Sequence, residues 1–597
     1  MKKSGLRVLS LVLVLTMILG LGACGSQPAS NPTPTPSNSS NTTPSDTSTP
    51  ADKAYDKFIT IDMFNSQANY QGIQSGWFGK VIKDRFNMEI NIIAPNVAGG
   101  GDTLFQTRSA AGFLGDIVTL GAENGRLADT VKAGLLMDIT DMVVKSQYLS
   151  KYPQATDMLK NLIGSDRIYA IPSQVSSLSP LTPSEGNDLT YGPYLRWDYY
   201  MALGAPRIRT LEDLLPILKE MQDKYPTSDS GKKAYAISLF KDWDGNMMCL
   251  AKQPACMYGY DEIGFALVSA DGKTVQSIID SDSEYIRSLR FFYEANQLGI
   301  LDPDSPTQNW DTLAAKYADG AVHWSPWPWQ GQIYNTVEHK AEGKGFMIAP
   351  MEDMKIFSYG CNPTGNKYCI AVGSKAQDPQ RMVDFIDWLY SPEGVMMSCA
   401  QTTGSCGPEG LTWEMKDGRP VLTEFGVKAF SGDQTLMMPE SWGGGTYKDG
   451  ISQLNYQAVS TMEINPLNNA PYNYSLWPSY LESNTTPLDK SWKEFMKAET
   501  TLDYLSQHNA YTVAPGNNYI PEAAPAEIDT LRNQCREIIK ANSWKMVFAA
   551  NDAEFEALLK DMQDTVKGLG YDEVFAFDVK IAENTRKARE EAIANAK

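Results

Sequence analysis

The stretch Phe58-Ile59-Thr60-Ile61-Asp62-Met63-Phe64 begins an alternation of strands and helices that decides the fold. It is short and rich in β-branched and aromatic residues, which is typical of a strand. Helical spacing of apolar residues follows over 77–86, and Glu89-Ile90-Asn91-Ile92-Ile93-Ala94 is a second strand-like run. A third run, Asp116-Ile117-Val118-Thr119-Leu120, follows an amphipathic stretch at 104–111. Strands that alternate with helices predict βαβ units and a mostly parallel sheet, so we assign the chain to the α/β class.

The same alternation continues further along the chain. Thr210-Leu211-Glu212-Asp213 has the form of a capping box, and the apolar residues of one helical face follow it. Residues 234–240 then have the pattern of a strand. A further strand is predicted at 368–372, before a helix whose apolar face runs from Met382 to Leu389. From about residue 485 onward the pattern is largely helical.

The first 23 residues have the pattern of a secretory signal peptide. Residues 1–7 hold three positive charges, residues 8–21 are almost wholly apolar, and Leu21-Gly22-Ala23-Cys24 ends the run. The apolar run is shorter than the about 20 residues that a permanent span needs, so we expect it to be removed. Leu-Gly-Ala-Cys resembles the bacterial lipobox, which implies cleavage before Cys24 and lipid attachment to its thiol. The alternative is a plain secretory signal in which Cys24 is incidental.

The residues after Cys24 have the composition of a tether. Ser, Thr, Pro and Asn make up 22 of the 26 residues at 25–50, and such a segment cannot bury a core. The chain as a whole is 42% hydrophobic and 10% aromatic, which is an ordinary globular composition. We therefore expect a signal peptide at 1–23, a lipidated cysteine and linker at 24–53, and a large folded body at 54–597.

The charge balance bears on the partners of the protein. The net charge is −19 over 597 residues, and removal of the leader, with Lys2, Lys3 and Arg7, would make it −22. Such a surface repels phosphate backbones and anionic lipid headgroups. We therefore expect no nucleic-acid partner.

Several short motifs are informative because of their order. After the lipobox and the tether come Leu114-Gly115-Asp116-Ile117, Gly134 to Thr140, Ile168-Tyr169-Ala170-Ile171-Pro172, Leu195-Arg196-Trp197-Asp198-Tyr199 and Ser391-Pro392-Glu393-Gly394. Together they resemble the extracellular solute-binding proteins of ABC importers, family 1, and in particular the large oligosaccharide-binding lipoproteins. The resemblance covers nearly all of residues 55–430. It implies a periplasmic-binding-protein-like fold of type II, with two discontinuous lobes joined by a hinge, a ligand cleft, and an extra helical C-terminal region.

The resemblance also implies a function. It implies a non-enzymatic, lipid-anchored receptor on the outer face of the cell membrane, which captures an oligosaccharide and delivers it to an ABC transporter permease. We expect a monomer without a cofactor. Some relatives carry a calcium loop rich in Asp, Asn and Gly, but Ser228-Asp229-Ser230-Gly231-Lys232-Lys233 offers one carboxylate and two lysines. Calcium requires six to eight oxygen ligands, so we expect no metal in this loop.

An unusual density of tryptophan marks the candidate sugar site. An indole offers a flat apolar face to the C–H face of a pyranose and one N–H donor to a hydroxyl. Pro326 and Pro328 should prevent a regular helix here, so we expect the indoles to be displayed from a loop. The alternative is that they fill the core, where tryptophan is common. The cluster comprises Trp310, Trp324, Trp327 and Trp329, and we predict ligand contacts for Trp324, Trp327 and Trp329.

Two polar loops are further candidates. Lys241-Asp242-Trp243-Asp244-Gly245-Asn246 follows a predicted strand, and Asn65-Ser66-Gln67-Ala68-Asn69-Tyr70 follows the first strand. Ligands of open α/β sheets bind beyond the carboxyl ends of the strands. The predicted contacts from these loops are Asp242, Trp243, Asp244, Asn65, Gln67 and Tyr70.

A cell-surface glycoside hydrolase or lyase is the alternative function. It would require two carboxylates about 5 to 9.5 Å apart. Asp242 and Asp244 in an extended chain would have Cα atoms about 6.6 Å apart, so their spacing permits such a pair. The three histidines, His323, His339 and His508, do not have metal-ligand spacing, and no metal site is predicted.

Seven cysteines follow Cys24. Six of them form close pairs in the sequence, Cys249 with Cys256, Cys361 with Cys369, and Cys399 with Cys406, whereas Cys535 stands alone. An exported location permits disulfides, but each pair could equally be two small buried hydrophobic residues. The pairing is left open.

Overall fold

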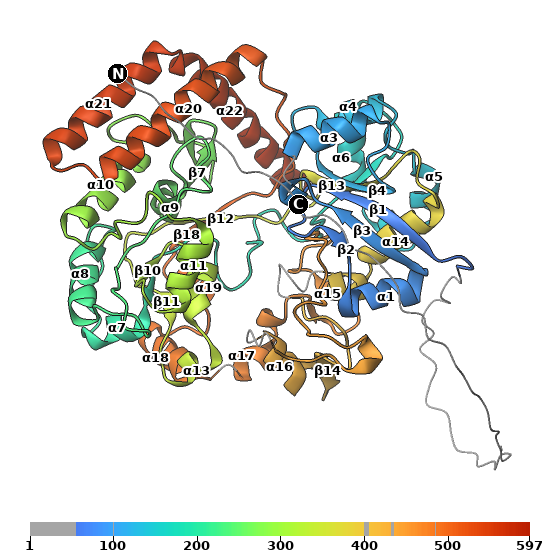
Figure 1. Cartoon of the computed structure of the whole chain (residues 1–597), viewed down its shortest axis with the longest axis horizontal. Helices are drawn as coiled ribbons and strands as arrows, with labels where there is room; N and C mark the ends of the chain where they lie inside the picture. The colour runs from blue at the N-terminus through green and yellow to red at the C-terminus, as the bar shows by residue number, and fades with distance from the viewer. Residues whose placement is uncertain (1–54, 99–100, 399–404, 431–434, 484, 597) are drawn as a thin grey trace, which may run out of the picture. The chain divides into compact units, whose positions relative to one another are not determined.

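The computed structural model describes residues 55–98, 101–398, 405–430, 435–483 and 485–596 (Figure 1). The described residues belong to one compact unit. The predicted signal peptide, the lipidation site Cys24, the linker up to residue 53, and Cys399 lie outside the described residues. Within the described ranges, no helix is both long and apolar enough to cross a membrane.

A six-stranded sheet forms the first lobe. Its order is β2 (Gly72–Ile73), β3 (Met88–Ile93), β1 (Ile59–Asn65), β4 (Ile117–Gly121), β13 (Tyr368–Val372) and β5 (Ala170–Pro172). The predicted strands are confirmed, and β1 runs parallel to both β3 and β4. The sheet is nevertheless mixed rather than mostly parallel, since β13 is antiparallel to β4 and to β5. The reason is that β13 re-enters the sheet at the carboxyl end of β4, after the chain has passed through the second lobe.

Both faces of this sheet are buried. Successive residues of a strand point to opposite faces, and Ile117 and Ile370 accordingly join one hydrophobic cluster while Val118 and Ala371 join another. A sheet covered on both faces is typical of an α/β fold. The helices that pack with it, the blue, cyan and yellow ones in Figure 1, are α1 (Gly76–Phe86), α3 (Gly101–Ala110), α4 (Arg126–Lys132), α5 (Thr140–Val144), α6 (Pro153–Ile163), α14 (Pro379–Leu389) and α15 (Pro392–Ser398).

The second lobe has its own hydrophobic core. A small antiparallel sheet in the order β10 (Trp324–Ser325), β6 (Tyr194–Arg196) and β11 (Phe346–Ile348) lies within it. The predicted strand at 234–240 is wrong as a regular strand, because the segment pairs with each neighbour at a single residue, Tyr235 with Val322 and Ile237 with Leu301. The surrounding helices are α7 (Trp197–Ala202), α8 (Leu214–Lys224), α9 (Cys249–Met257), α10 (Glu284–Gln297), α11 (Trp310–Ala318), α18 (Pro487–Met496) and α19 (Thr501–Gln507).

Helix α8 illustrates one success and one error of the sequence pattern. The predicted capping box is wrong: the helix begins at Leu214, and its N-cap Asp213 makes no side-chain hydrogen bond to the first turn. Residues before it form a turn in which the Asp213 amide donates to the Thr210 carbonyl at 3.2 Å. The apolar face is confirmed, since its members are all buried: Leu211, Leu214, Leu215, Leu218 and Met221.

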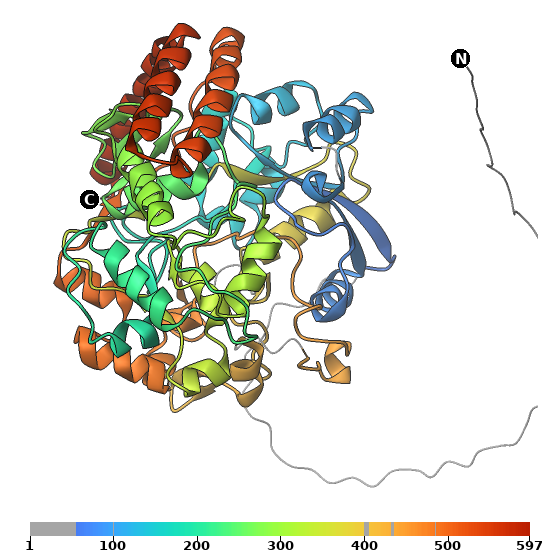
Figure 2. The same ribbon diagram turned by 60° about the vertical axis from the view of Figure 1, so that its left-hand side comes forward.

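The C-terminal region is helical, as predicted. Helices α20 (Ala526–Val547), α21 (Asp552–Gly568) and α22 (Tyr571–Asn595), red in Figures 1 and 2, pack side by side. They are fastened to the second lobe by buried polar contacts, among them the Tyr285 and Ser543 hydroxyls at 2.8 Å. One strand interrupts the helices: β18 (Tyr511–Ala514) pairs in parallel with β12 (Ile356–Tyr359).

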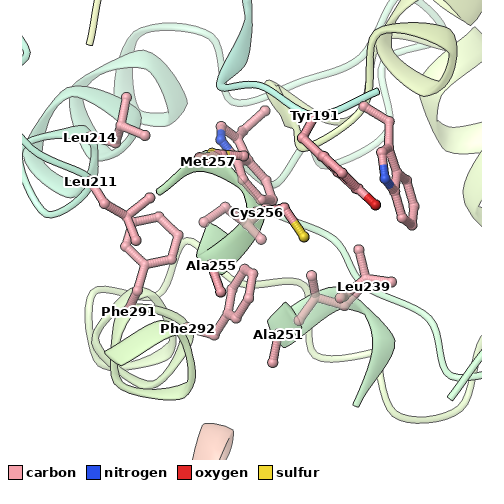
Figure 3. Packing of buried hydrophobic residues seen from close by; sticks show 14 of the residues in the cluster. Tyr191, Leu211, Leu214, Leu239, Ala251, Ala255, Cys256, Met257, Phe291 and Phe292 are labelled. Carbon is pink, nitrogen blue, oxygen red and sulfur yellow. The ribbon is translucent and has the colours of Figure 1, made fainter. Parts of the chain in front are cut away.

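The cysteines of the described residues are free thiols: Cys249, Cys256, Cys361, Cys369, Cys406 and Cys535. Cys256 lies in α9 among Tyr191, Leu239 and Phe292 (Figure 3). Burial raises the pKa of its thiol well above the ordinary value. In the pairs at 249/256 and 361/369 the thiols are thus free, with Cys256, Cys361 and Cys369 buried and Cys249 partly exposed.

Three segments meet where the chain passes between the lobes, and we call them the crossing segments: the turn at 180–184 and the stretches 358–361 and 514–516. Backbone hydrogen bonds join them, with the Gly360 amide donating to the Ala514 carbonyl and the Gly516 amide donating to the Pro180 carbonyl, both at 2.9 Å. A Cβ at Gly360 would lie 1.9 Å from the Pro180 carbonyl oxygen, and one at Gly516 would lie 1.9 Å from that of Cys361. Glycine is therefore required at both positions for the segments to approach this closely.

Candidate functional site

Four tryptophans of the second lobe pack together, and we call them the tryptophan face: Trp243, Trp310, Trp327 and Trp329. The ring centroids of Trp243 and Trp310 are 5.4 Å apart, and those of Trp327 and Trp329 are 5.2 Å apart, with interplanar angles of 29° and 22°. Trp243 also lies 5.9 Å from Trp329, which links the two stacked pairs. The structure thus brings the predicted contacts Trp243, Trp327 and Trp329 together although they come from two separate segments of the chain.

The members of the tryptophan face differ in exposure. Trp243 and Trp329 are 45% and 42% exposed, whereas Trp327 is only 6% exposed. The Trp327 indole N–H donates to the Gln253 Oε1 of α9 at 3.1 Å. The buried ring is therefore held in place and supports two rings that keep an apolar surface in contact with solvent. Large exposed aromatic surfaces that are rigidly supported are well suited to stacking against a ligand.

The tryptophan face lies where two extended segments of the second lobe end. Trp243 follows segment 234–240, and Trp327 follows β10. The expectation that the two prolines exclude helix is wrong, because Pro328 opens the short helix α12 (Pro328–Gly331) at a position where proline is tolerated. Trp310 is the first residue of α11, and its amide donates to the Asp242 carboxylate at 2.9 Å.

Trp324 has a different environment. It is 1% exposed, and its ring lies 6.1 Å from Phe291 and 5.9 Å from Phe292, both of α10. Trp324 is part of the second-lobe core. For this residue the alternative interpretation, in which the tryptophans fill the core, is the correct one. Trp324 is therefore not available to a ligand and is not part of the candidate binding site.

The two acidic residues that flank Trp243 have structural partners. Both oxygens of Asp244 accept hydrogen bonds, from the Cys249 amide at 2.9 Å and the Trp544 indole N–H at 2.7 Å. Burial raises the pKa of the Asp244 carboxyl. Asp242 accepts from the start of α11, so both carboxylates are engaged in hydrogen bonds that position neighbouring elements.

A polar network connects α9 with the crossing segments, and the sequence prediction did not include it. The Tyr191 and Tyr359 hydroxyls lie 2.6 Å apart, and Tyr359 also donates to the Asp261 carboxylate. Lys252 pairs with Asp261 at 2.7 Å. Burial alone would lower the pKa of Lys252, but Asp261 and the other acidic groups around it together outweigh burial and hold that pKa well above the ordinary value. Tyr191 and Tyr359 are far in the chain from Lys252 and Asp261, which lie nine residues apart, so no local pattern could have grouped all four.

The predicted loop after β1 is held by internal hydrogen bonds. Asn65 is fully buried; its amide donates to the Leu454 carbonyl at 2.7 Å, and its oxygen accepts from the Gln67 and Ala68 amides and from Thr119. The Gln67 carbonyl accepts from the side chain of Asn455, and the Tyr70 hydroxyl donates to the Ile73 carbonyl at 2.9 Å. The polar groups of Asn65 and Tyr70 are therefore engaged in shaping the loop itself.

A cavity of about 330 Å³ opens beside this loop at the carboxyl ends of the first-lobe strands. Ligands of open α/β sheets bind at this edge. Two of its charged lining residues neutralise each other, since Arg126 pairs with Asp102 at 2.7 Å. Its walls include residues at the carboxyl ends of β1, β3 and β4 and at the start of β13, namely Phe64, Ser66, Pro95, Gly121, Asn124 and Tyr368.

The loop at 228–234 is closed by hydrogen bonds between side chains. The Ser228 and Ser230 hydroxyls both donate to the Asp319 carboxylate at 2.7 Å, and Asp229 accepts from the Tyr334 hydroxyl at 2.9 Å. The carboxylates near this loop are thus paired with hydroxyl donors. Over the described part of the chain, no group of His, Cys, Asp and Glu side chains has the arrangement of a metal site.

Two separate cores, close-packed crossing segments and a supported aromatic face at strand ends define a two-lobed binding-protein fold. Solved structures of ABC-transporter substrate-binding proteins share this fold over nearly their whole length. The protein FusA of Streptococcus pneumoniae in complex with kestose matches with a TM-score of 0.58 at 14% identity, covering 88% of this chain and 99% of FusA. The alginate-binding protein AlgQ2, solved without calcium, matches with a TM-score of 0.56 at 14% identity, covering 90% and 99%.

A third structure gives the same result. The extracellular solute-binding protein of Bifidobacterium longum subsp. infantis matches with a TM-score of 0.55 at 14% identity, covering 90% of this chain and 99% of that one. No family model and no curated protein match the chain. The type II binding-protein fold that the sequence motifs implied is thereby confirmed.

Proposed function

We propose that this protein is an extracellular substrate-binding protein of an ABC transporter that captures an oligosaccharide. The observation that carries the proposal is the tryptophan face, on which Trp243 and Trp329 are exposed while Trp327 is fixed beneath them by Gln253. Carbohydrate rings present C–H faces that stack on indoles, so this surface suits a sugar. The structural neighbours support the same class, since FusA is described with kestose and AlgQ2 as alginate-binding.

Hinge closure is the proposed mechanism. A glycan on the tryptophan face that also contacts the first lobe would stabilise the closed state by its differential affinity for that state. The crossing segments are the natural hinge because Gly360 and Gly516 allow them to lie in direct contact. The permease subunits would then recognise the closed form.

A thermal-shift screen of the purified protein against oligosaccharides tests the proposal. A ligand at 100 times its Kd should add about 2.7 kcal/mol to the free energy of unfolding. Each mixture is also analysed for cleavage products. Stabilisation by a glycan that stays intact supports the receptor, whereas cleavage of the glycan would establish the carbohydrate-active enzyme instead.

We also propose that the protein is a lipoprotein held at the membrane through Cys24. Two acyl chains anchor a protein stably, whereas one chain gives marginal binding. Substitution Cys24→Ala should move the protein from the membrane fraction to the medium. A Cys535→Ala variant, which alters a buried thiol of α20, is the control and should remain with the membrane.

A further inference from the structure

A second cavity, of about 900 Å³, lies between elements of the two lobes. On the second-lobe side its walls include Tyr194, Phe346 and Trp492, which belong to the second-lobe core. On the other side lie Phe430 of α16 (Glu424–Phe430) and Tyr480 of α17 (Pro478–Ser483), which pack against the first-lobe core. A volume near the upper end of the about 300 to 1,000 Å³ of ligand sites exceeds what a single small group requires.

The lining of this cavity combines aromatic rings with neutral polar groups. Tyr474 and Tyr480 supply partly exposed rings, and Asn187, Asn473 and Gln332 supply amides. Each amide already makes at least one hydrogen bond in the fold: Asn187 donates to the Ser475 carbonyl at 2.7 Å, Asn473 accepts from the Ser475 amide at 2.9 Å, and Gln332 donates to Asp188 at 3.1 Å. An amide offers both a donor and an acceptor, so this bonding leaves part of its capacity for a ligand hydroxyl. Rings interspersed with amides and hydroxyls suit a ligand whose surface alternates between C–H faces and hydroxyls.

The charges around the cavity disfavour an anionic ligand. Its lining contains four carboxylates, Glu185, Asp188, Asp489 and Glu499, against two lysines. Lys340 pairs with Asp489 at 3.4 Å, and Lys493 pairs with Glu499 at 3.0 Å. Each lysine that lines the described walls is therefore already neutralised, and the chain as a whole carries a net charge of −19. An acidic glycan would meet no uncompensated cation here and would be repelled by the protein's field.

The cavity is continuous with the tryptophan face along the chain. Helix α12 carries Trp329 and continues directly into the 3₁₀ turn η2 (Gln332–Tyr334), whose Gln332 lines the cavity. Residues three apart on a helix share a face, with Cβ atoms about 5–6 Å apart. Trp329 and Gln332 are both exposed, whereas Gln330 and Gly331 between them are buried. A ligand stacked on Trp329 can therefore extend over this turn into the cavity.

We propose that this cavity is a second carbohydrate subsite, which binds the uncharged continuation of a glycan stacked on the tryptophan face. The proposal rests on the proposed function and narrows it to neutral oligosaccharides longer than the tryptophan face alone can hold. The feature that carries it is the juxtaposition of Trp329 with a large, amide-lined cavity one helical turn away, in which both lining lysines are paired with carboxylates.

Calorimetric titration with a length series tests the subsite. The probes are neutral fructo-, gluco-, manno- and xylo-oligosaccharides of two to six units, with oligouronates of matched length. Val427 of α16 lines the cavity and is 54% exposed, so Val427→Arg should obstruct it without unfolding the protein. Val144 of α5 is 68% exposed and lies outside the cavity lining, so Val144→Arg is the matched control.

We expect one neutral series to bind with an affinity that rises at least tenfold from two to six units. Val427→Arg should remove that gain and leave the shortest ligand unaffected, while Val144→Arg changes neither. Equal affinities along the series, or equal behaviour of the two variants, would overturn the subsite and leave the proposed function standing. Tighter binding of oligouronates than of neutral oligosaccharides would overturn only the inference that the ligand is uncharged. Failure of every glycan to bind would overturn the proposed function and the subsite together.

Discussion

The loop after β1 and the tryptophan face both follow the ends of extended segments, but they differ in what their side chains are free to do. In the loop, Asn65 is fully buried and makes four hydrogen bonds within its own lobe. In the tryptophan face, Trp329 is 42% exposed and keeps its ring surface open. Position at a strand end therefore does not make a residue available to a ligand. Availability depends on whether the fold has already used the side chain's binding capacity.

The same contrast occurs within one short segment. His323 and Trp324 are buried, whereas Trp329, a few residues later, is exposed. Trp324, before Pro326, belongs to β10 and the core, whereas Trp329, after it, is the exposed residue of α12, whose other residues Pro328, Gln330 and Gly331 are buried. Substitutions on the two sides of Pro326 should thus separate stability from binding.

The largest effect is expected for Trp324→Ala. Removal of a fully buried tryptophan leaves a cavity beside Phe291 and Phe292 and should lower the free energy of unfolding by about 3–5 kcal/mol. Denaturant titration measures this loss. Trp329→Ala serves as the matched control, because the same side chain is removed from the exposed side. Equal losses of stability in the two variants would contradict the assignment of Trp324 to the core and of Trp329 to the surface.

Asn65→Ala should come next. It leaves two backbone amides and the buried Thr119 hydroxyl without their acceptor, so we expect a loss of about 2–4 kcal/mol in the free energy of unfolding. The exposed Asn69 of the same loop provides the control Asn69→Ala, which should change stability by less than about 0.5 kcal/mol. If Asn65→Ala weakens glycan binding and leaves stability intact, the loop is a ligand contact after all.

His323 should make the protein sensitive to acid. Burial, with a smaller contribution from Arg196, lowers the pKa of His323 to about 3, from about 6.5 when unfolded. Between these values the unfolded state binds the additional proton, so stability is lost as the pH falls. From pH 7 to pH 4.5 the loss from this residue is about 2–3 kcal/mol.

The substitution His323→Leu isolates this contribution. Neither ring nitrogen of His323 has a hydrogen-bond partner, so an apolar side chain leaves no protein group unpaired there. The free energy of unfolding is measured at pH 7 and at pH 4.5 for the variant and the wild type. The loss between the two pH values should be smaller in the variant by about 2–3 kcal/mol. Parallel pH profiles would show that His323 does not titrate as the buried site requires.

The smallest effect on stability is expected for Trp329→Ala, which should cost less than about 1 kcal/mol because the ring is partly exposed. Its effect on affinity should instead be about 2 kcal/mol, or about 30-fold in Kd, because a stacking surface is removed. Calorimetric titration with the best glycan checks the value, and Trp329→Phe, which keeps a flat ring, should restore part of it. Unchanged affinity in Trp329→Ala would show that the tryptophan face is structural.

The sequence by itself determined the α/β class, four of the six first-lobe strands (β1, β3, β4 and β13), the buried face of α8 and the helical C-terminus. These features follow from local periodicity, because a strand or helix repeats its burial pattern within a few residues. The motif order also indicated the two-lobed fold, and the density of tryptophan indicated the region of the candidate site. The sequence pattern did not distinguish Trp324, Trp327 and Trp329, however, because neighbouring tryptophans of one segment have the same local sequence environment whether they are buried or exposed.

Only the tertiary structure decided which of these groups remain available. Trp243 packs against Trp329 from a loop more than eighty residues earlier, and Asp244 accepts a hydrogen bond from Trp544 of the C-terminal helices. The direction of β13, the Tyr191–Tyr359 contact and the close approach of Gly360 to Pro180 likewise depend on segments that meet only after folding. Hydrogen-bond capacity and exposure are set by such long-range partners, whereas local patterns record only the tendency of each segment to be buried.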